Sequence, residues 1–518
     1  MRTRPVCPVF CFAMLVAACG TSTATTATHS SSSTRDAAAH VVDAHADASD
    51  TSDANEASAV PLDAAVAANA LPVGQVGHTG RWLTDTTGRV LLLHGVNVVN
   101  KNAPFTPAAE GFADDDAAWL ADNGFRVVRV GILASGLMPA PGMVDTSYIA
   151  EIAATVTNLA SHGIYSLLDF HQDGWGPVVG SDGFPAWMTV TGSAMNVPEP
   201  FPFYYEENPA LQQAFQSFWD DAAGPDGVGL QEDYTAMFSA VAKQLAGEPY
   251  VLGYDLLNEP WPGTTWMPCQ DDAAGCPALD ASELAPVYTK VVTAIRAAGD
   301  RHLIFGEPFV LFNFGVSTTS LTVPGADSNA GMAFHVYPAL MAQAPDVISN
   351  ALAWSASNPQ GALLNTEWGA STDPTLLTAE SQELDAALVP WIFWSFDSEL
   401  VPSLASPPGG ANEVAASVQV LVQPYPLAVA GTPETLTVDA TAQTLSFTWS
   451  TVPVAGGPFA SGTVTTFEAP VTAYPAGYTA TATHGTITSS PCAPLLTVVA
   501  DTGATTVTVD MQPGGNCR

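Results

Sequence analysis

Basic residues are scarce in this 518-residue sequence, in which Lys and Arg total 13 against 50 Asp and Glu, for a formal net charge of -37. A protein that binds nucleic acid needs a basic surface facing the phosphates, so the shortage argues against that class. It also argues against electrostatic attraction to an anionic membrane. Beyond the first twenty residues no run of about 18 uninterrupted apolar residues occurs, so the sequence predicts no membrane-spanning helix.

The N-terminus has the features of an export signal. Arg2 and Arg4 precede a short apolar run at 6–16, and the segment Val16-Ala17-Ala18-Cys19-Gly20 resembles the cleavage site of bacterial lipoproteins. We therefore expect a signal peptide over 1–19 with a lipid on Cys19; an ordinary secretory signal is the alternative. Residues 20–72 are rich in Ala, Ser, Thr and Asp, which predicts a disordered tether. The protein would then be lipid-anchored at the bacterial cell surface or outer membrane, or secreted.

Cysteine is also scarce, with seven in total, of which four lie beyond Cys19: Cys269, Cys276, Cys492 and Cys517. Four cysteines allow three pairings, and export favours disulfides over metal binding. The ten histidines form no group at ligand spacing. We expect neither a metal nor a cofactor.

Residues 73–422 alternate between strand-like and helix-like patterns. Eight apolar runs read as strands, at 91–99, 125–130, 165–170, 251–257, 302–305, 332–336, 362–366 and 391–394. Helical patterns lie between most of them, at 113–123, 146–162, 206–245, 281–298 and 375–387. Eight such units predict an α/β fold, a (β/α)8 TIM barrel, whose active site lies at the carboxyl ends of the strands.

Residues 423–518 have a different sequence pattern. Short segments rich in Thr and Val alternate in polarity and are separated by Gly and Pro, as at 435–438, 444–449 and 505–511. This pattern predicts a C-terminal β-sandwich domain.

Two glutamates stand at the ends of predicted barrel strands. Glu259 lies in Asn258-Glu259-Pro260 after the fourth strand, and Glu367 lies in Thr366-Glu367-Trp368 on the seventh. Two carboxylates that face one pocket are the minimal equipment for cleaving a glycosidic bond. Either glutamate alone could equally be a structural ion-pair partner.

With these motifs the sequence resembles glycoside hydrolase family 5, a retaining family built on this barrel. The resemblance implies that Glu259 is the acid/base and Glu367 the nucleophile. Three further matches support it: Arg129 on strand two, His335 with Tyr337 on strand six, and Trp394 at the end of strand eight. It implies that Arg129 and His335 support the catalytic pair, and that Trp394 forms the floor of the sugar site.

A narrower resemblance points to the endoglycoceramidases, which cleave glycosphingolipids between the sugar chain and ceramide. It rests on His94-Gly95-Val96-Asn97 with Lys101, on Asp169-Phe170-His171-Gln172-Asp173, and on the Pro424-Tyr425-Pro426 junction. It implies a glycosphingolipid substrate. The residues expected to bind it are Lys101, His171, Asp173, Asn258, Tyr337 and Trp394.

The implied reaction needs a protonated Glu259 and an ionised Glu367, with the carboxyl groups about 5–5.5 Å apart. An apolar groove for the lipid could use loop aromatics, namely Trp175, Phe201, Phe203, Tyr204, Tyr205, Phe312 and Phe314. We expect a monomer that binds no nucleic acid and meets membranes only through its lipid anchor. Two alternatives stay open, a β-glucanase acting on soluble polysaccharide and a non-catalytic glycolipid-binding surface protein.

Overall fold

The structure is a computed structural model of the chain. It describes residues 70–72, 74–270, 275–315, 318–337, 344–515 and 517. The predicted signal peptide, the lipid site at Cys19 and most of the predicted tether lie outside the described residues. The end of the tether prediction needs correction, because Ala70 is buried and its carbonyl oxygen accepts hydrogen bonds from Thr466 and Arg89. Residues 70–72 therefore belong to the folded body.

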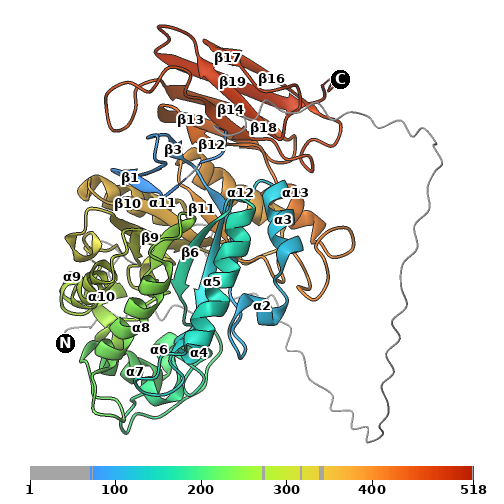
Figure 1. The fold of residues 1–518 in the computed structure, drawn as a ribbon. Helices are drawn as coiled ribbons and strands as arrows, with labels where there is room; N and C mark the ends of the chain where they lie inside the picture. The colour runs from blue at the N-terminus through green and yellow to red at the C-terminus, as the bar shows by residue number, and fades with distance from the viewer. Residues whose placement is uncertain are drawn as a thin grey trace, which may run out of the picture. The chain divides into compact units, whose positions relative to one another are not determined.

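Eight parallel strands close into a barrel, as the sequence predicted (Figure 1). Each strand pairs with the next one along the chain, and the last pairs with the first. Every residue of these strands is buried, which explains why they appear in the sequence as continuous apolar runs. The barrel strands are β4 (His94–Val98), β5 (Val127–Ile132), β6 (Tyr165–Phe170), β7 (Val251–Asp255), β8 (Leu303–Gly306), β9 (Ala330–Val336), β10 (Ala362–Trp368) and β11 (Trp391–Phe393).

Helices follow most barrel strands. The described α-helices are α2 (Pro107–Glu110), α3 (Asp114–Asp122), α4 (Ala134–Leu137), α5 (Thr146–Ser161), α6 (Phe203–Glu207), α7 (Pro209–Trp219), α8 (Leu230–Leu245), α9 (Pro277–Leu279), α10 (Ala285–Ala297), α11 (Ala344–Ser357), α12 (Pro374–Ala386) and α13 (Ala415–Leu421). None of the helices in the described part of the chain has both the length and the hydropathy needed to cross a bilayer.

Among the longer helices the structure differs from the prediction in two places. The single helix expected over 206–245 is divided into α6, α7 and α8, and a turn with Asp221 in the left-handed region separates α7 from α8. The Gly-Pro-Asp-Gly sequence at 224–227 is the breaker that the prediction overlooked. Helix α11 was not predicted, although buried Val347, Ala351 and Trp354 recur in it at helical spacing.

The C-terminal domain contains two packed sheets, as predicted. One has four strands: β13 (Thr432–Asp439), β14 (Thr444–Ser450), β19 (Thr506–Pro513) and β16 (Tyr478–Thr483). The other includes β12 (Tyr425–Val429), β15 (Thr465–Glu468), β18 (Leu495–Ala500) and β17 (Gly485–Ile487). Their facing side chains share one apolar core that contains Phe447 and Trp449 of one sheet and Phe467 of the other. Disulfides join Cys269 to Cys276 and Cys492 to Cys517.

The segment before the barrel belongs to the C-terminal sheet, not to the barrel. Strands β1 (Gly77–Thr79), β2 (Trp82–Thr84) and β3 (Val90–Leu91) extend that sheet through pairing of β3 with β12 (Figure 1). The sequence analysis assigned these residues to the barrel domain that starts at residue 73. The side-chain pattern of a short strand does not reveal its partner, and here the partner lies at the other end of the chain.

This antiparallel sheet, built from both ends of the folded chain, covers one end of the barrel. Leu83, Leu91 and Leu427 from its strands lie in one apolar cluster with barrel residues Leu167 and Leu364. The buried Arg126 also donates to Glu468 of β15 at 2.6 Å, and Tyr425 donates to the carbonyl of Gly124 at 2.6 Å. The amino ends of the barrel strands are therefore closed by packing, and the polar side chains gather at the opposite end.

Candidate active site

Glu259 and Glu367 meet at the carboxyl end of the barrel. Glu259 follows β7 and Glu367 lies near the end of β10, and both are about 2% exposed. A carboxylate oxygen of each lies within 4.8 Å of the other and of a His335 ring nitrogen. This spacing agrees with the separation of about 5–5.5 Å in retaining glycosidases and falls short of the 6.5–9.5 Å of inverting enzymes. The pairing predicted from the sequence is therefore present.

The surroundings of Glu259 keep a proton on it near neutral pH. Burial raises the pKa of Glu259 to about 7, and the nearby charge of Glu367 acts in the same direction. His335 opposes both, because its Nδ1 lies 2.9 Å from Glu259 Oε1. The side-chain amide of Asn313 donates to the same oxygen at 3.4 Å. A carboxyl group of this kind can donate a proton at neutral pH and take it back.

Glu367 receives hydrogen bonds at both carboxylate oxygens. Arg129 Nη1 donates to Oε1 at 2.6 Å, and the hydroxyl of Tyr337 donates to Oε2. The register between β9 and β10 shifts between Asn365 and Glu367, and such irregularities in a sheet redirect side chains near active sites. Burial raises the pKa of Tyr337 well above its usual value, so this phenol remains a donor.

Arg129 is the centre of a buried ionic network. Its guanidinium lies 2.9 Å from Asp169, 3.0 Å from Asp255 and 3.1 Å from Glu307, in addition to its bond with Glu367. All of these side chains are essentially inaccessible to solvent. A buried charge is tolerated only where it is paired and hydrogen-bonded, so this constellation fixes the position of Arg129 beside Glu367.

His335 lies between three carboxylates. Its Nδ1 is 3.5 Å from Glu367 and its Nε2 is 3.1 Å from Glu307, in addition to the bond with Glu259. Burial disfavours the charged imidazolium, but Glu307, Glu367 and Glu259 outweigh that cost and raise the pKa of His335 well above its usual value.

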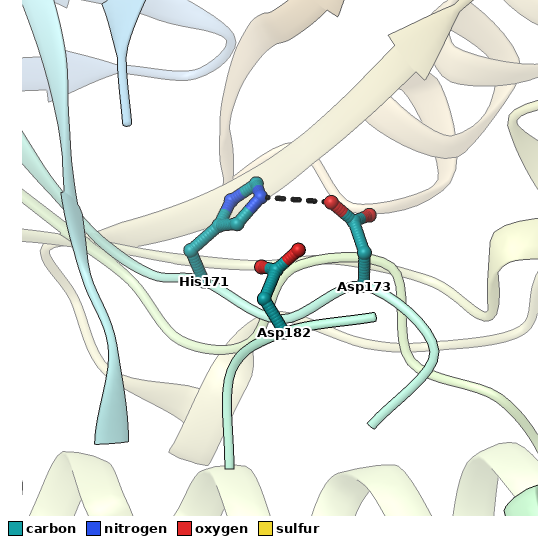
Figure 2. Close-up of side chains that lie close together, drawn as sticks. All are labelled: His171, Asp173 and Asp182. Carbon is teal, nitrogen blue, oxygen red and sulfur yellow. Dashed lines mark hydrogen bonds and ion pairs between the residues drawn. The ribbon is translucent and has the colours of Figure 1, made fainter. Parts of the chain in front are cut away.

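A second polar cluster contains four of the predicted sugar-binding residues. Lys101 pairs with Asp173, and His171 Nε2 lies 3.2 Å from the same Asp173 oxygen (Figure 2). The ring of Trp394 stacks with His171 at 5.4 Å, and the ammonium of Lys101 lies 4.8 Å from its centroid. Trp394 and Lys101 remain partly exposed, as side chains that contact a ligand must be.

The two clusters are connected through Asp169, which accepts from His171 Nδ1 at 2.7 Å and pairs with Arg129. Asn258 is also part of the network. Its side-chain oxygen accepts from Arg129 at 2.8 Å, and its amide donates to the carbonyl of Gln172 at 3.0 Å. All ten residues predicted for the catalytic, binding and supporting roles therefore lie in one connected site.

The structure adds carboxylates that the sequence analysis did not single out. These carboxylates are Asp169, Asp182, Asp255 and Glu307. Asp169, Asp255 and Glu307 each follow or end a run of apolar residues, which was the available signal, whereas Asp182 lies in a Gly/Ser-containing loop that gave none. Asp182 lies beside Asp173 because their backbones pair across the neck of a short loop, and Figure 2 shows both carboxyl groups near His171.

The group His171, Asp173 and Asp182 could in principle hold a metal ion, because its ligand atoms lie within 4.8 Å of one another. However, the ammonium of Lys101 pairs with Asp173 and lies 3.9 Å from Asp182. The positive charge of this lysine therefore already balances these carboxylates. The donors of this cluster fit sugar hydroxyls better than a metal ion.

The aromatic residues considered for a lipid groove separate into two groups. Trp175, Tyr205 and Phe312 are at most 2% exposed and belong to the barrel core, so their prediction as groove residues was wrong. Tyr204 is also buried. Phe201 is 51% exposed, and Phe203 and Phe314 are partly exposed. A loop position in the sequence did not reveal which rings the loops bury.

Comparison with known proteins agrees with this geometry. Residues 94–399 match the family described as Cellulase (glycosyl hydrolase family 5), and residues 423–510 match the Glycoside hydrolase family 5 C-terminal domain. The chain is 31% identical to Endoglycoceramidase I of Rhodococcus hoagii (strain 103S) over 470 residues, which cover 86% of this chain and 90% of that protein. It is 31% identical over 287 residues to Endoglycoceramidase of Hydra vulgaris, covering 49% of this chain and 53% of that protein.

Solved structures give the same result. The cellobiose-like imidazole complex of endo-glycoceramidase II from Rhodococcus sp. matches with a TM-score of 0.68 and 26% identity, covering 84% of this chain and 100% of that one. The lactosyl-enzyme intermediate of that protein matches with a TM-score of 0.67 and 25% identity over the same shares.

Proposed function

The chain belongs to glycoside hydrolase family 5, and we propose that it hydrolyses the bond between the oligosaccharide and the ceramide of glycosphingolipids with retention of configuration. The observation that carries this proposal is the approach of Glu259 and Glu367 to within 4.8 Å at the mouth of the barrel. The relatives described as endoglycoceramidases support the substrate class. The lactosyl-enzyme intermediate of one relative is a covalent species of the kind that retaining glycosidases form.

In the first step Glu259 gives its proton to the ceramide oxygen while Glu367 attacks the anomeric carbon. Without that proton the departing group would be an alkoxide, which is a poor leaving group. Arg129 and Tyr337 hold the attacking carboxylate through its two oxygens. In the second step Glu259 takes a proton from a water molecule whose oxygen attacks the anomeric carbon. The bond to Glu367 breaks, and the sugar leaves with its original configuration.

Lys101, His171, Asp173 and Trp394 bind the sugar beside the cleaved bond in this proposal. The aromatic face of Trp394 suits the C–H side of a sugar ring, and the polar groups suit its hydroxyls. We also propose that Asn258 contacts the 2-hydroxyl; its side-chain oxygen accepts from Arg129 and its amide donates to the carbonyl of Gln172.

On the lipid side we propose that Phe314 and Phe201 contact the ceramide. Phe314 contacts the ring of Tyr337 at 6.2 Å between centroids, which places it next to the catalytic pair. Replacing Phe314 with Ala should raise KM for glycosphingolipids and leave KM for a water-soluble β-lactoside unchanged. An equal rise in KM for both substrates would show that Phe314 does not contact the ceramide.

The deciding experiment is to incubate the protein with a panel of glycosphingolipids and separate the products by thin-layer chromatography. We expect intact oligosaccharide and free ceramide. Release of sugar from cellulose or another β-glucan without release of ceramide would support a β-glucanase instead. Tight glycolipid binding without any product would support a non-catalytic binding protein.

We also propose that the protein is exported as a monomer and anchored at the bacterial surface or outer membrane through Cys19. The segment Val16–Gly20 and the Ala/Ser/Thr/Asp-rich stretch after it support this proposal. In a bacterial host a Cys19→Ser variant should move from the membrane fraction to a soluble fraction, and mass spectrometry of the wild type should find a lipidated N-terminal peptide. Light scattering of the purified protein measures its mass in solution and so tests whether it is a monomer.

A further inference from the structure

Glu307 is a fully buried carboxylate to which the proposed chemistry gives no task. It directly follows β8 and is 0% exposed. One of its oxygens lies 3.1 Å from both Arg129 and His335, and the other accepts the backbone N–H of Glu259 at 3.0 Å. A buried carboxylate is retained only where its partners compensate for desolvation, so its three contacts need a joint explanation.

The first contact concerns the backbone of Glu259. Glu259 has a φ of 42°, in the left-handed region that costs free energy for any residue other than glycine. Glu307 holds the N–H side of this residue. From the other side, the amide of Gln172 donates to the carbonyl of Glu259 at 3.0 Å and to that of Asn258 at 2.7 Å. The strained backbone is therefore held at both ends by buried side chains.

The second contact concerns the side chain of Glu259. Glu307 pairs with Nε2 of His335, whose Nδ1 lies 2.9 Å from Glu259 Oε1. The ring is thus fixed between two carboxyl groups, and its orientation determines where that Glu259 oxygen lies. Glu307 therefore acts on the same residue twice, once through the main chain and once through the imidazole.

We propose that Glu307 is a positioning residue for proton transfer by Glu259, which it holds by the backbone N–H and, through His335, by the carboxyl group. The inference rests on the proposed function, because it assigns Glu259 as the acid. It predicts that damage at Glu307 harms those substrates whose leaving group needs a proton. A misplacement of a catalytic group by about 1 Å can cost 10²-fold in rate.

The test compares two substrates with the full-length protein. Lactosylceramide needs acid catalysis, whereas 2,4-dinitrophenyl β-lactoside has a leaving group that departs without a proton. For Glu307→Gln we expect kcat/KM to fall about 100-fold on lactosylceramide and to stay within about 5-fold on the dinitrophenyl glycoside. The second substrate also controls for damage to Glu367 through Arg129, because nucleophilic attack is needed for both.

A Glu307→Asp variant retains the charge, so it guards against a Gln variant that fails to fold. Its shorter side chain should loosen the grip on the Glu259 N–H and give the same substrate-selective loss in a smaller degree. Glu283→Gln is the matched control, because Glu283 is another buried carboxylate and interacts with Asp220 and Gln216 outside the site. It should leave both rates near those of the wild type, and thermal melting checks each fold.

The pH profile supplies an independent readout. His335 faces Glu259, Glu307 and Glu367, and Glu307 favours its charged form. The imidazolium lowers the pKa of Glu259. Loss of the Glu307 charge in Glu307→Gln disfavours the imidazolium, so the pKa of Glu259 should rise. The alkaline limb of kcat/KM should therefore move to higher pH in Glu307→Gln and stay in place in Glu307→Asp.

Equal losses on both substrates, or no loss on lactosylceramide in a folded variant, would overturn the inference. If the wild-type protein cleaves neither substrate, the proposed function fails instead, so the two failures are distinguishable.

Discussion

The protonation of Glu259 should control the alkaline limb of activity. Burial raises the pKa of Glu259 to about 7, so the protonated fraction falls from about 0.9 at pH 6 to about 0.1 at pH 8. Because only the protonated form can donate to the ceramide oxygen, kcat/KM for lactosylceramide should fall about tenfold over this interval. Tyr337 does not contribute to this limb, since burial raises its pKa well above its usual value.

The assay measures initial release of oligosaccharide from detergent-solubilised lactosylceramide between pH 5 and pH 9 at constant ionic strength. The same series with 2,4-dinitrophenyl β-lactoside should lack this limb, because dinitrophenolate departs unprotonated. Glu259→Gln should lose most activity on the lipid and retain much of its kcat/KM on the activated substrate. A profile that is flat to pH 9, or the same limb on both substrates, would refute the assignment of the acid.

Four further outcomes are expected. Glu367→Gln should lower turnover by at least about 10⁴-fold, and NMR of the wild-type reaction should show the β-anomer first; an initial α-anomer would contradict double displacement. Arg129→Lys should lower the melting temperature and the rate together, because one ammonium cannot serve four carboxylates; wild-type stability would contradict this. Removing the Cys492–Cys517 disulfide, which spans 25 residues, should cost about 3.5 kcal/mol of stability in denaturant unfolding, and no change would show that the bond is dispensable. Burial raises the pKa of Glu380 to about 8, so the folded state holds a proton that the unfolded chain releases above about 4.5. The melting temperature should thus fall as pH rises from 5 to 8.5, and less so in Glu380→Gln.

The barrel strands and the catalytic pair were predictable from sequence because both depend on local patterns. Barrel strands are buried on both faces, so they appear as apolar runs, and a polar residue at the end of such a run stands out. Glu259 and Glu367 satisfied this criterion. The resemblance to a known family then identified Arg129, His335 and Trp394.

Glu307 also follows an apolar run, but its role was not predictable, because no family motif marked it and its partners come from other strands. Arg129 lies 178 residues before it and Glu259 lies 48 residues before it, and only closure of the barrel brings the three together. In the sequence Gly306-Glu307-Pro308 resembles an ordinary loop. The groove prediction failed for Trp175 for a related reason: its loop folds inward, so its ring stacks against Phe184 in the core.

The pairing of β3 with β12 makes the C-terminal domain discontinuous in the chain. Removing residue 423 and everything after it would expose the edge of β3 that pairs with β12. It would also leave Arg126 without its partner Glu468, so the shortened enzyme should aggregate. A chimera that borrows this domain for another barrel must therefore transplant the leading hairpin as well. Recombination between relatives should therefore keep residues 77–91 and the segment from residue 423 onward together.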